Sequence, residues 1–173
     1  MRNKRKEKNY AFIDGANLHL GVKAQGWRMD YKKFRLYLKN KYRVSKAFIF
    51  IGWVEDNQQL YEYLKQDGFE LVFKPTIPYM EKGSVTYKGN VDAELVLHAA
   101  AVEYDNYDQA VVVTSDGDFA CLIEFLIERK KLKKIITPTG KYSSLMGKYR
   151  DHIVLVKNIK SKIADRSPVK NKK

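Results

Sequence analysis

The fold is decided by one stretch, Ala110-Val111-Val112-Val113-Thr114-Ser115-Asp116-Gly117-Asp118-Phe119. Its first four residues are apolar and mostly β-branched, and the run is too short for an amphipathic helix, so it predicts a fully buried strand. The sequence Ser-Asp-Gly-Asp then supplies a turn and a cap that start a helix over 119–129. Two carboxylates, Asp116 and Asp118, therefore follow a central strand, at the edge where ligands bind in open α/β sheets.

Short apolar strands alternate with helices along the rest of the chain. We expect further strands at 10–13, 46–54, 70–74, 134–137 and 152–156, and further helices at 31–42, 57–66, 91–104 and near 143–149. Residues 75–90, which include Pro78, predict a long loop with at most a small hairpin near 84–87. This alternation predicts an α/β fold with a central, mainly parallel sheet, helices on both faces and a strand order near 3-2-1-4-5.

Length and composition predict one folded domain. The 173 residues are 45% hydrophobic and 13% aromatic, which suits a full core. We expect a basic flexible arm at 1–8, a domain at 9–158 and a basic flexible tail at 159–173. Neither a membrane-length apolar run nor a signal peptide is visible, so we expect a cytoplasmic protein without a membrane partner. The one cysteine, Cys121, excludes an intrachain disulfide, and its place in a helix predicts a buried core thiol.

The net charge of +13 is concentrated at the two ends of the chain. Residues 1–8 contain five basic residues and one acidic residue, and residues 157–173 contain seven and one, so these ends carry +4 and +6. Lysine-rich arms attract polyanions through the release of counterions, which indicates nucleic acid as a partner. Arms that only keep the protein soluble fit the same charge pattern.

Topology brings two more carboxylates to the edge that carries Asp116 and Asp118. Asp14 ends the first strand, and Asp92 begins the helix at 91–104. In a parallel sheet, strand ends and the starts of the following helices share one edge, so we expect these four side chains to face one crevice. Glu94 points away from it by helix geometry. Taken singly, each of the four aspartates is also explained by a helix cap or a turn.

A cluster of four aspartates indicates a bound cation. Carboxylates about 4 Å apart repel by ~4 kcal/mol at an effective dielectric constant near 20, so they need a counter-cation or shared protons. Oxygen ligands without cysteine or histidine indicate a hard ion, Mg²⁺ or Mn²⁺. Such an ion activates water and neutralises charge on a phosphodiester, so the pattern indicates metal-assisted hydrolysis.

Four residues beside the aspartates are weaker candidates. Lys88 precedes the helix of Asp92 and is a candidate for phosphate contact, with simple solvation as the alternative. Asn17 is a candidate to hydrogen-bond an aspartate or a water, or to cap its helix. Ser115 is a candidate to orient a ligand carboxylate, or to form the turn. His98 is expected to pack in its apolar helix, and no pattern among the three histidines indicates catalysis centred on histidine.

Three segments together resemble the NYN domain family, in its LabA-like branch, within the PIN-like nuclease superfamily. They are Phe12-Ile13-Asp14-Gly15-Ala16-Asn17-Leu18, Lys88-Gly89-Asn90-Val91-Asp92 and Thr114-Ser115-Asp116-Gly117-Asp118-Phe119, and the similarity spans about residues 9–156. The resemblance implies a PIN-like three-layer α/β/α sandwich and an Mg²⁺- or Mn²⁺-dependent endoribonuclease acting on single-stranded or structured RNA. By position it makes Asp14, Asp92, Asp116 and Asp118 the catalytic and metal-binding residues, with Asn17 and Ser115 as auxiliary site residues.

Other functions use the same residues differently. A non-catalytic RNA-binding or regulatory module keeps the fold and uses the aspartates for turns or a structural ion. A nucleotide-sugar transferase uses Asp116 and Asp118 as a D-x-D metal clamp, but leaves Asp14 and Asp92 without a role. A haloacid-dehalogenase-like phosphatase requires an acid where Ala16 stands, and a dinucleotide-binding fold requires a glycine-rich fingerprint after the first strand. Assembly into a homo-oligomer is left open.

Overall fold

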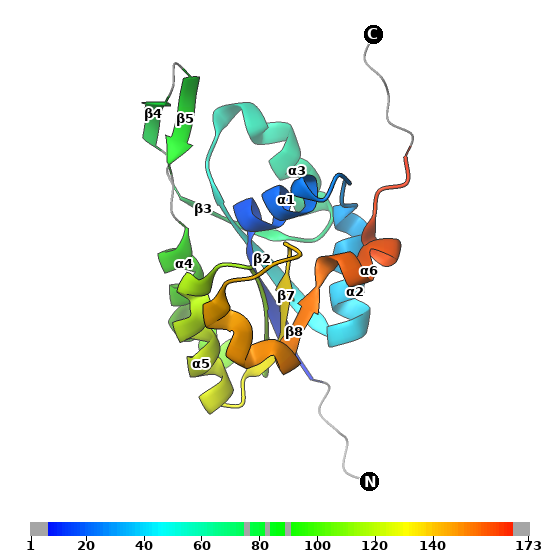
Figure 1. The fold of residues 1–173 in the computed structure, drawn as a ribbon, viewed down its shortest axis with the longest axis vertical. Helices are drawn as coiled ribbons and strands as arrows, with labels where there is room; N and C mark the ends of the chain where they lie inside the picture. Colours follow the sequence, from blue (N-terminus) through cyan, green and yellow to red (C-terminus); the bar gives the residue numbers. More distant parts are fainter. Residues whose placement is uncertain (1–6, 75–76, 82–83, 89–90, 168–173) are drawn as a thin grey trace.

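The computed structural model describes residues 7–74, 77–81, 84–88 and 91–167, and its centre is a six-stranded sheet (Figure 1). All neighbouring strands in this sheet are parallel. In spatial order the strands are β3 (Glu70–Lys74), β2 (Val44–Gly52), β1 (Asn9–Asp14), β6 (Ala110–Val113), β7 (Leu132–Thr137) and β8 (Ile153–Leu155). Numbered within this sheet alone, the order is 3-2-1-4-5-6. The predicted α/β fold is therefore confirmed, with one strand added to the predicted order.

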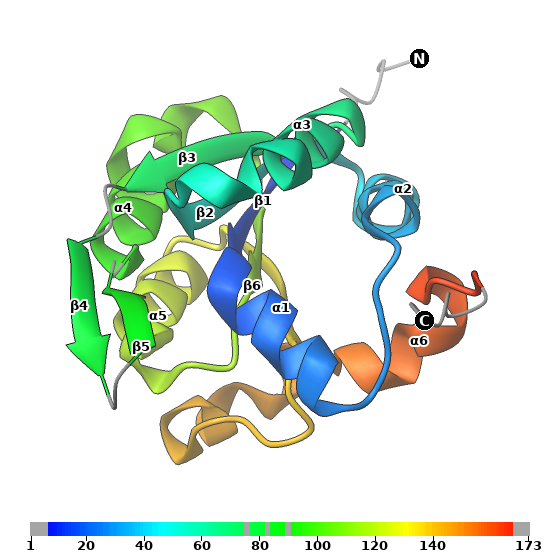
Figure 2. The same ribbon diagram turned by 90° about the horizontal axis from the view of Figure 1, so that it is seen from above.

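Helices cover both faces of the sheet and complete a three-layer sandwich (Figure 2). The first layer contains α1 (Gly15–Ala24), α2 (Tyr31–Tyr42), α3 (Gln58–Gln66) and α6 (Val156–Ile163). The second contains α4 (Asp92–Leu97), the π-helical turn His98–Val102, α5 (Ala120–Glu128) and the 3₁₀ segment Ser144–His152. Since both faces are covered, strands such as β1 are buried along their whole length, as is typical of parallel sheets.

The side chains of β1 show how the two halves of the core are built. Tyr10 and Phe12 point into the layer of α4 and α5, whereas Ala11 and Ile13 point into the layer of α1 and α2. This alternation is the two-residue period of a strand. Asp14, the next residue, ends β1, and α1 begins directly after it. Its carboxylate therefore lies at the carboxyl edge of the sheet.

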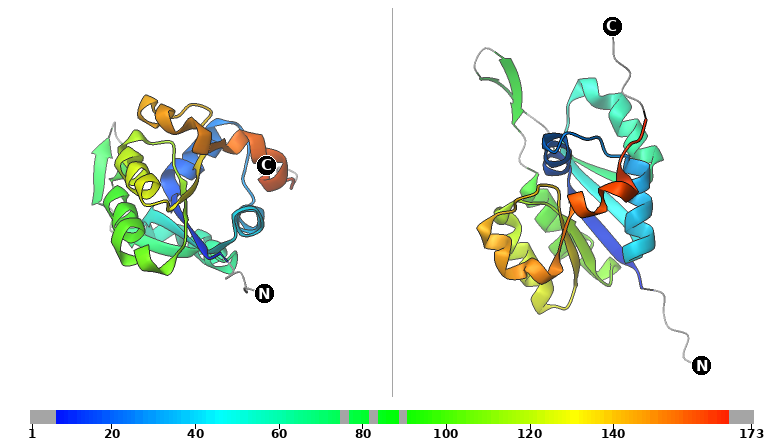
Figure 3. Two further views of the ribbon diagram at one scale, coloured as in Figure 1. Left: turned by 90° about the horizontal axis from the view of Figure 1, so that it is seen from below. Right: turned by 45° about the vertical axis from the view of Figure 1, so that its right-hand side comes forward.

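A hairpin stands apart from the central sheet (Figure 3, right). Its strands β4 (Ile77–Glu81) and β5 (Ser84–Lys88) pair in antiparallel fashion. The sequence predicted a loop with at most a small hairpin near 84–87, because Pro78 and the glycines argue against regular strands. Every strand of a two-stranded sheet is an edge strand, where a proline is tolerated. The hairpin is therefore longer than predicted.

The C-terminal helix crosses the boundary that the sequence predicted at residue 158. Val156, Ile159 and Ile163 of α6 are buried in the layer of α2. The chain after α6 is also bound to the segment before α2, through an antiparallel bridge between Met29 and Ala164 and an ion pair of 2.5 Å between Arg28 and Asp165. Residues 159–167 thus pack on the domain, while 1–6 and 168–173, which complete the predicted flexible arm and tail, lie outside the described residues.

Two further predictions concern single features. Cys121 is exposed, so the prediction of a buried thiol is wrong. The residues of α5 that face the sheet are Leu122, Ile123 and Leu126, and Cys121 lies beside this stripe instead of in it. In the described part of the chain, no helix is long and apolar enough to cross a membrane.

Candidate metal centre

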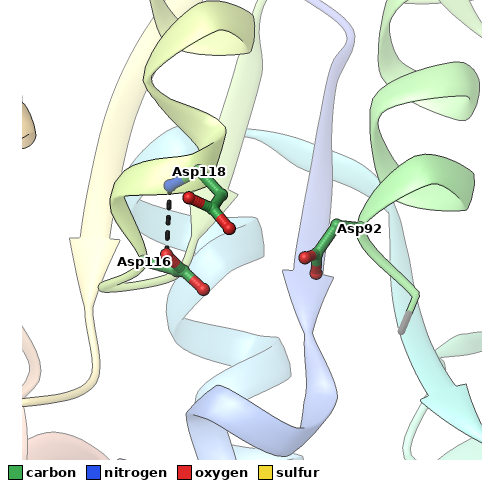
Figure 4. A group of neighbouring side chains, drawn as sticks. All are labelled: Asp92, Asp116 and Asp118. Atoms are coloured by element: carbon green, nitrogen blue, oxygen red, sulfur yellow. Dashed lines mark hydrogen bonds between the residues drawn. The ribbon is translucent and has the colours of Figure 1, made fainter. Parts of the chain in front are cut away.

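Three carboxylates meet at the carboxyl edge of the sheet (Figure 4). Asp92 begins α4, and Asp116 and Asp118 belong to the turn that follows β6. One carboxylate oxygen from each residue lies within 4.8 Å of the other two. In Figure 4, Asp92 faces Asp116 and Asp118 from the opposite side of the end of β1. The structure thus brings together three of the four aspartates that topology assigned to one crevice.

Local hydrogen bonds stabilise the turn after β6 that carries Asp116 and Asp118. The amide of Asp118 donates to Oδ1 of Asp116 at 3.0 Å, and the amide of Asp116 donates to Oγ1 of Thr114 at 3.1 Å. Gly117 between them is buried against Ser143, and a Cβ added there would lie 2.8 Å from the Ser143 Cβ. Only glycine fits at this position, so the spacing Asp-Gly-Asp follows from packing as well as from turn geometry.

Asp14 lies next to the three carboxylates and deeper in the protein. Its side chain is only 7% exposed; Oδ1 accepts the amide of Asn17 at 3.0 Å, and Oδ2 accepts Oγ1 of Thr114 at 3.4 Å. Burial raises the pKa of Asp14, and the charges of Asp92 and Asp116 raise it further. Asp14 is not among the oxygens that meet within 4.8 Å, but it is close enough to interact electrostatically with two of them.

Asn17 and Ser115 have different partners from those the sequence suggested. Oδ1 of Asn17 accepts the amide of Ser115 at 2.9 Å, which joins α1 to the turn after β6. The hydroxyl of Ser115 accepts the amide of Thr139 at 3.1 Å, which joins the same turn to the loop after β7. Both side chains therefore hold backbone segments together around the carboxylates.

Sequence reasoning missed Thr114, which contacts both Asp14 and the turn of Asp116. Its side chain is fully buried, and its hydroxyl donates to Asp14 while it accepts the amide of Asp116. The available signal was a hydroxyl that directly follows the buried apolar run 110–113. Thr114 links the strand end of Asp14 to the loop of Asp116, and so fixes the relative positions of two carboxylates.

Of three other candidates, Glu94 and His98 are not part of the cluster. The predicted phosphate contact of Lys88 concerns a side chain outside the described residues. Glu94 pairs with Lys74 at 3.3 Å. His98 packs as expected, with its ring 5.2 Å from that of Phe50 and Nδ1 2.9 Å from the carbonyl oxygen of Glu94.

The cluster fits a hard divalent cation. Its donors are carboxylate oxygens, which Mg²⁺ and Mn²⁺ prefer. Mg²⁺ binds its ligands at about 2.0–2.1 Å and keeps several waters, so carboxylates up to 4.8 Å apart suit an ion that is held partly through water. Asp14 is buried beside these carboxylates, and the charges of Asp92 and Asp116 add to the effect of burial in raising its pKa, so a cation would relieve repulsion here.

Comparison with known proteins agrees with this fold and this geometry. The family model described as the NYN domain matches residues 9–156. This chain belongs to the NYN domain family. The resemblance inferred from three short segments is therefore confirmed, and NYN membership implies the fold of PIN-like nucleases.

Two relatives of this NYN domain are similar over most of their length. One is the "Low amplitude and bright protein LabA" of Synechococcus elongatus, 22% identical over 157 residues, which cover 87% of this chain and 84% of LabA. The other is a crystal structure of a protein of unknown function from Vibrio parahaemolyticus RIMD 2210633. It has a TM-score of 0.70 and 25% identity, and the match covers 90% of this chain and 96% of that one. The matched region therefore covers most of each relative.

Proposed function

We propose that this NYN domain is a cytoplasmic, divalent-metal-dependent endoribonuclease. The observation that carries the proposal is the convergence of Asp92, Asp116 and Asp118 within 4.8 Å, next to the buried carboxylate of Asp14. Four like charges in one crevice oppose one another unless a cation is present. A chain with a net charge of +13, most of it near its two ends, that maintains such a cluster is well suited to bind an ion and a polyanion together.

The aspartates have distinct tasks in this proposal. Asp92, Asp116 and Asp118 would hold Mg²⁺ or Mn²⁺, and Asp14, the more deeply buried carboxylate beside them, would add negative charge. The bound ion supplies an activated water and neutralises the charge that develops on the phosphodiester. Thr114 positions Asp14 and the turn of Asp116 through its two hydrogen bonds. Asn17 and Ser115 hold the surrounding loops together through the amides of Ser115 and Thr139.

RNA is the proposed substrate because the family has a nuclease fold and the chain is basic. Basic residues near both ends would attract the phosphate backbone in a salt-dependent way. Lys88, which ends β5 four residues before Asp92, is a further proposed contact of the backbone.

The proposal is tested by cleavage of a labelled single-stranded RNA in Mg²⁺, in Mn²⁺ and in EDTA. The key variant is Asp116→Asn, because asparagine can still accept the amide of Asp118 while the ligand charge is lost. The matched control is Asp151→Asn, an exposed aspartate just before β8 and thus at the opposite edge of the sheet. We expect metal-dependent cleavage that falls by about 100-fold in Asp116→Asn and is unchanged in Asp151→Asn.

Two results would contradict the proposal. Cleavage by Asp116→Asn at the wild-type rate would show that the cluster is not the catalytic site. RNA binding by the wild type without cleavage in either metal would favour the RNA-binding module instead. Circular dichroism of each variant checks that the fold is retained.

A further inference from the structure

A tryptophan stands at the same edge of the sheet as the aspartates. Trp53 directly follows β2, and 41% of its surface is exposed. Asp14 pairs in register with Phe50 of β2, and Val54 after Trp53 still has extended backbone angles. Trp53 therefore lies three residues beyond the level of Asp14, which is about 10 Å along the strand direction.

The Trp53 ring is held in place by two other aromatic rings. Its centroid lies 5.0 Å from that of Phe73, in an edge-on arrangement, and 5.2 Å from that of Tyr61. Phe73 and Tyr61 also contact each other at 4.8 Å. Tyr61 in turn is fixed to the backbone, because its hydroxyl accepts the amide of Val54 at 2.9 Å. Trp53 is thus a rigid, partly exposed aromatic surface, which loses little conformational entropy when it binds a flat ring.

The surface is hollowed beside the loop that carries Trp53. A cavity of about 460 Å³ lies between α1 and α3, within the usual size range of small-ligand sites. On one side it is lined by Gly15 and Ala16, which follow Asp14, and on the other by Gly52 and Val54, which flank Trp53. Its floor includes the apolar side chain of Ile51. The cavity therefore borders the chain neighbours of Trp53 and of Asp14, although neither of these two side chains lines it.

The loop of Trp53 is also connected to the helix of Asp92, through contacts of β3 with α4. The amide of Trp53 donates to the carbonyl of Lys74 at 2.9 Å, and the ammonium group of Lys74 pairs with Glu94 at 3.3 Å. Glu94 lies in the first turn of α4, the helix that Asp92 begins. The loop of Trp53 and the helix of Asp92 are thus held together by fixed contacts along one edge of the sheet.

We propose that Trp53 forms a nucleobase-stacking subsite, on which a base of single-stranded RNA rests while its backbone lies at the aspartate cluster. This inference deepens the proposed function and depends on it for the identity of the polymer. Stacking suits any base, because every base has a π-face, and it requires a strand whose bases are unpaired. The subsite therefore favours single-stranded over double-stranded RNA, without a strong preference for sequence.

The test measures binding separately from cleavage. In the full-length chain with Asp116→Asn, we would measure the affinity for a labelled single-stranded oligonucleotide by fluorescence anisotropy at one fixed salt concentration. We expect Trp53→Ala to weaken binding by about 5- to 100-fold and Trp53→Phe to restore most of it. The control is Tyr63→Ala, since Tyr63 is an exposed ring within α3 rather than at the strand ends. Binding of blunt double-stranded RNA should be the same in all these variants.

A spectroscopic measurement covers the case in which Trp53→Ala perturbs the fold. The chain has two tryptophans, so Trp27→Phe leaves Trp53 as the only indole. RNA should then quench its fluorescence, and an abasic oligonucleotide of the same length should not. Absence of quenching, or an equal loss of affinity in Trp53→Ala and Tyr63→Ala, would overturn the inference. Quenching without any cleavage by the wild type would overturn only the proposed function, and cleavage without quenching only the stacking subsite.

Discussion

The two edges of the central sheet hold their charges in opposite ways. At the amino edge, the guanidinium of Arg35 donates to the carbonyls of Gly68, Val44 and Ser45 at 2.8–3.1 Å. At the carboxyl edge, Asp92, Asp116 and Asp118 face one another. The first arrangement pairs charge with backbone dipoles and is complete in itself. The second arrangement places carboxylates close together, and a bound cation would relieve the repulsion between them.

The size of a cavity alone does not separate these two edges. The amino edge has a cavity of about 730 Å³, lined by Lys8, Lys39 and Arg43 among others, which is larger than the cavity between α1 and α3. Charge alone does not separate them either, because both edges are strongly charged. The difference lies in which groups face one another: the Arg35 guanidinium faces carbonyl oxygens, whereas three carboxylates face one another at the carboxyl edge, and the following variants test this difference.

The largest effect is expected from Gly117→Ala at the carboxyl edge. The added Cβ would overlap Ser143, so we expect a loss of about 3 kcal/mol in the free energy of unfolding and a weaker affinity for Mn²⁺. Urea unfolding and calorimetric titration with Mn²⁺ measure these two quantities. Gly140→Ala is the matched control, because nothing lies within 4 Å of its added Cβ. Unchanged stability in Gly117→Ala would show that the turn has room to relax.

Arg35→Met tests the amino edge and should have an intermediate effect. Methionine retains most of the apolar stem but loses three hydrogen bonds to carbonyls, so we expect a loss of about 2 kcal/mol in the free energy of unfolding. Lys39→Met, on the exposed side of the same helix, should change it by less than about 0.5 kcal/mol. The Mn²⁺ affinity should be unchanged in both. A weakened Mn²⁺ affinity in Arg35→Met would mean that the two edges are coupled.

The smallest effect concerns the pH dependence of stability in EDTA. Because the pKa of Asp14 is raised in the folded state, the folded chain binds more protons than the unfolded chain between the ordinary aspartate pKa, about 4, and the raised value. The free energy of unfolding should therefore fall as pH rises through this interval. In Asp14→Asn this decline should be smaller, because the group that takes up the proton is gone. Urea unfolding at a series of pH values measures it, and the same pH slope in both proteins would contradict the assigned cause.

Much of the fold follows from local patterns and sheet topology. The helix predicted at 31–42 coincides with α2, and the strand predicted at 70–74 coincides with β3. Asp92 could be assigned to the edge of Asp116 because the starts of helices and the ends of parallel strands share one edge. This argument needs only the order of the elements, which apolar periodicity shows well.

Other features depend on contacts that sequence spacing does not contain. The partners of Asn17 and Ser115 lie 98 and 24 positions away, so side-chain chemistry alone could not identify them. The lysines of α6 indicate a solvated tail, whereas Val156, Ile159 and Ile163 follow the spacing of a buried helical face, and in the structure this apolar spacing decides the packing. The deeper position of Asp14 relative to the other aspartates also depends on how far each strand and helix extends.

The bridge between Met29 and Ala164 has a practical consequence for anyone who shortens this protein. A chain that stops at residue 158 loses Ile159 and Ile163, which are buried in the same core cluster as Phe34 and Leu38 of α2. Such a truncation exposes apolar side chains of α2 to solvent and favours aggregation. A chain that ends after residue 167 retains both isoleucines and the bridge between Met29 and Ala164.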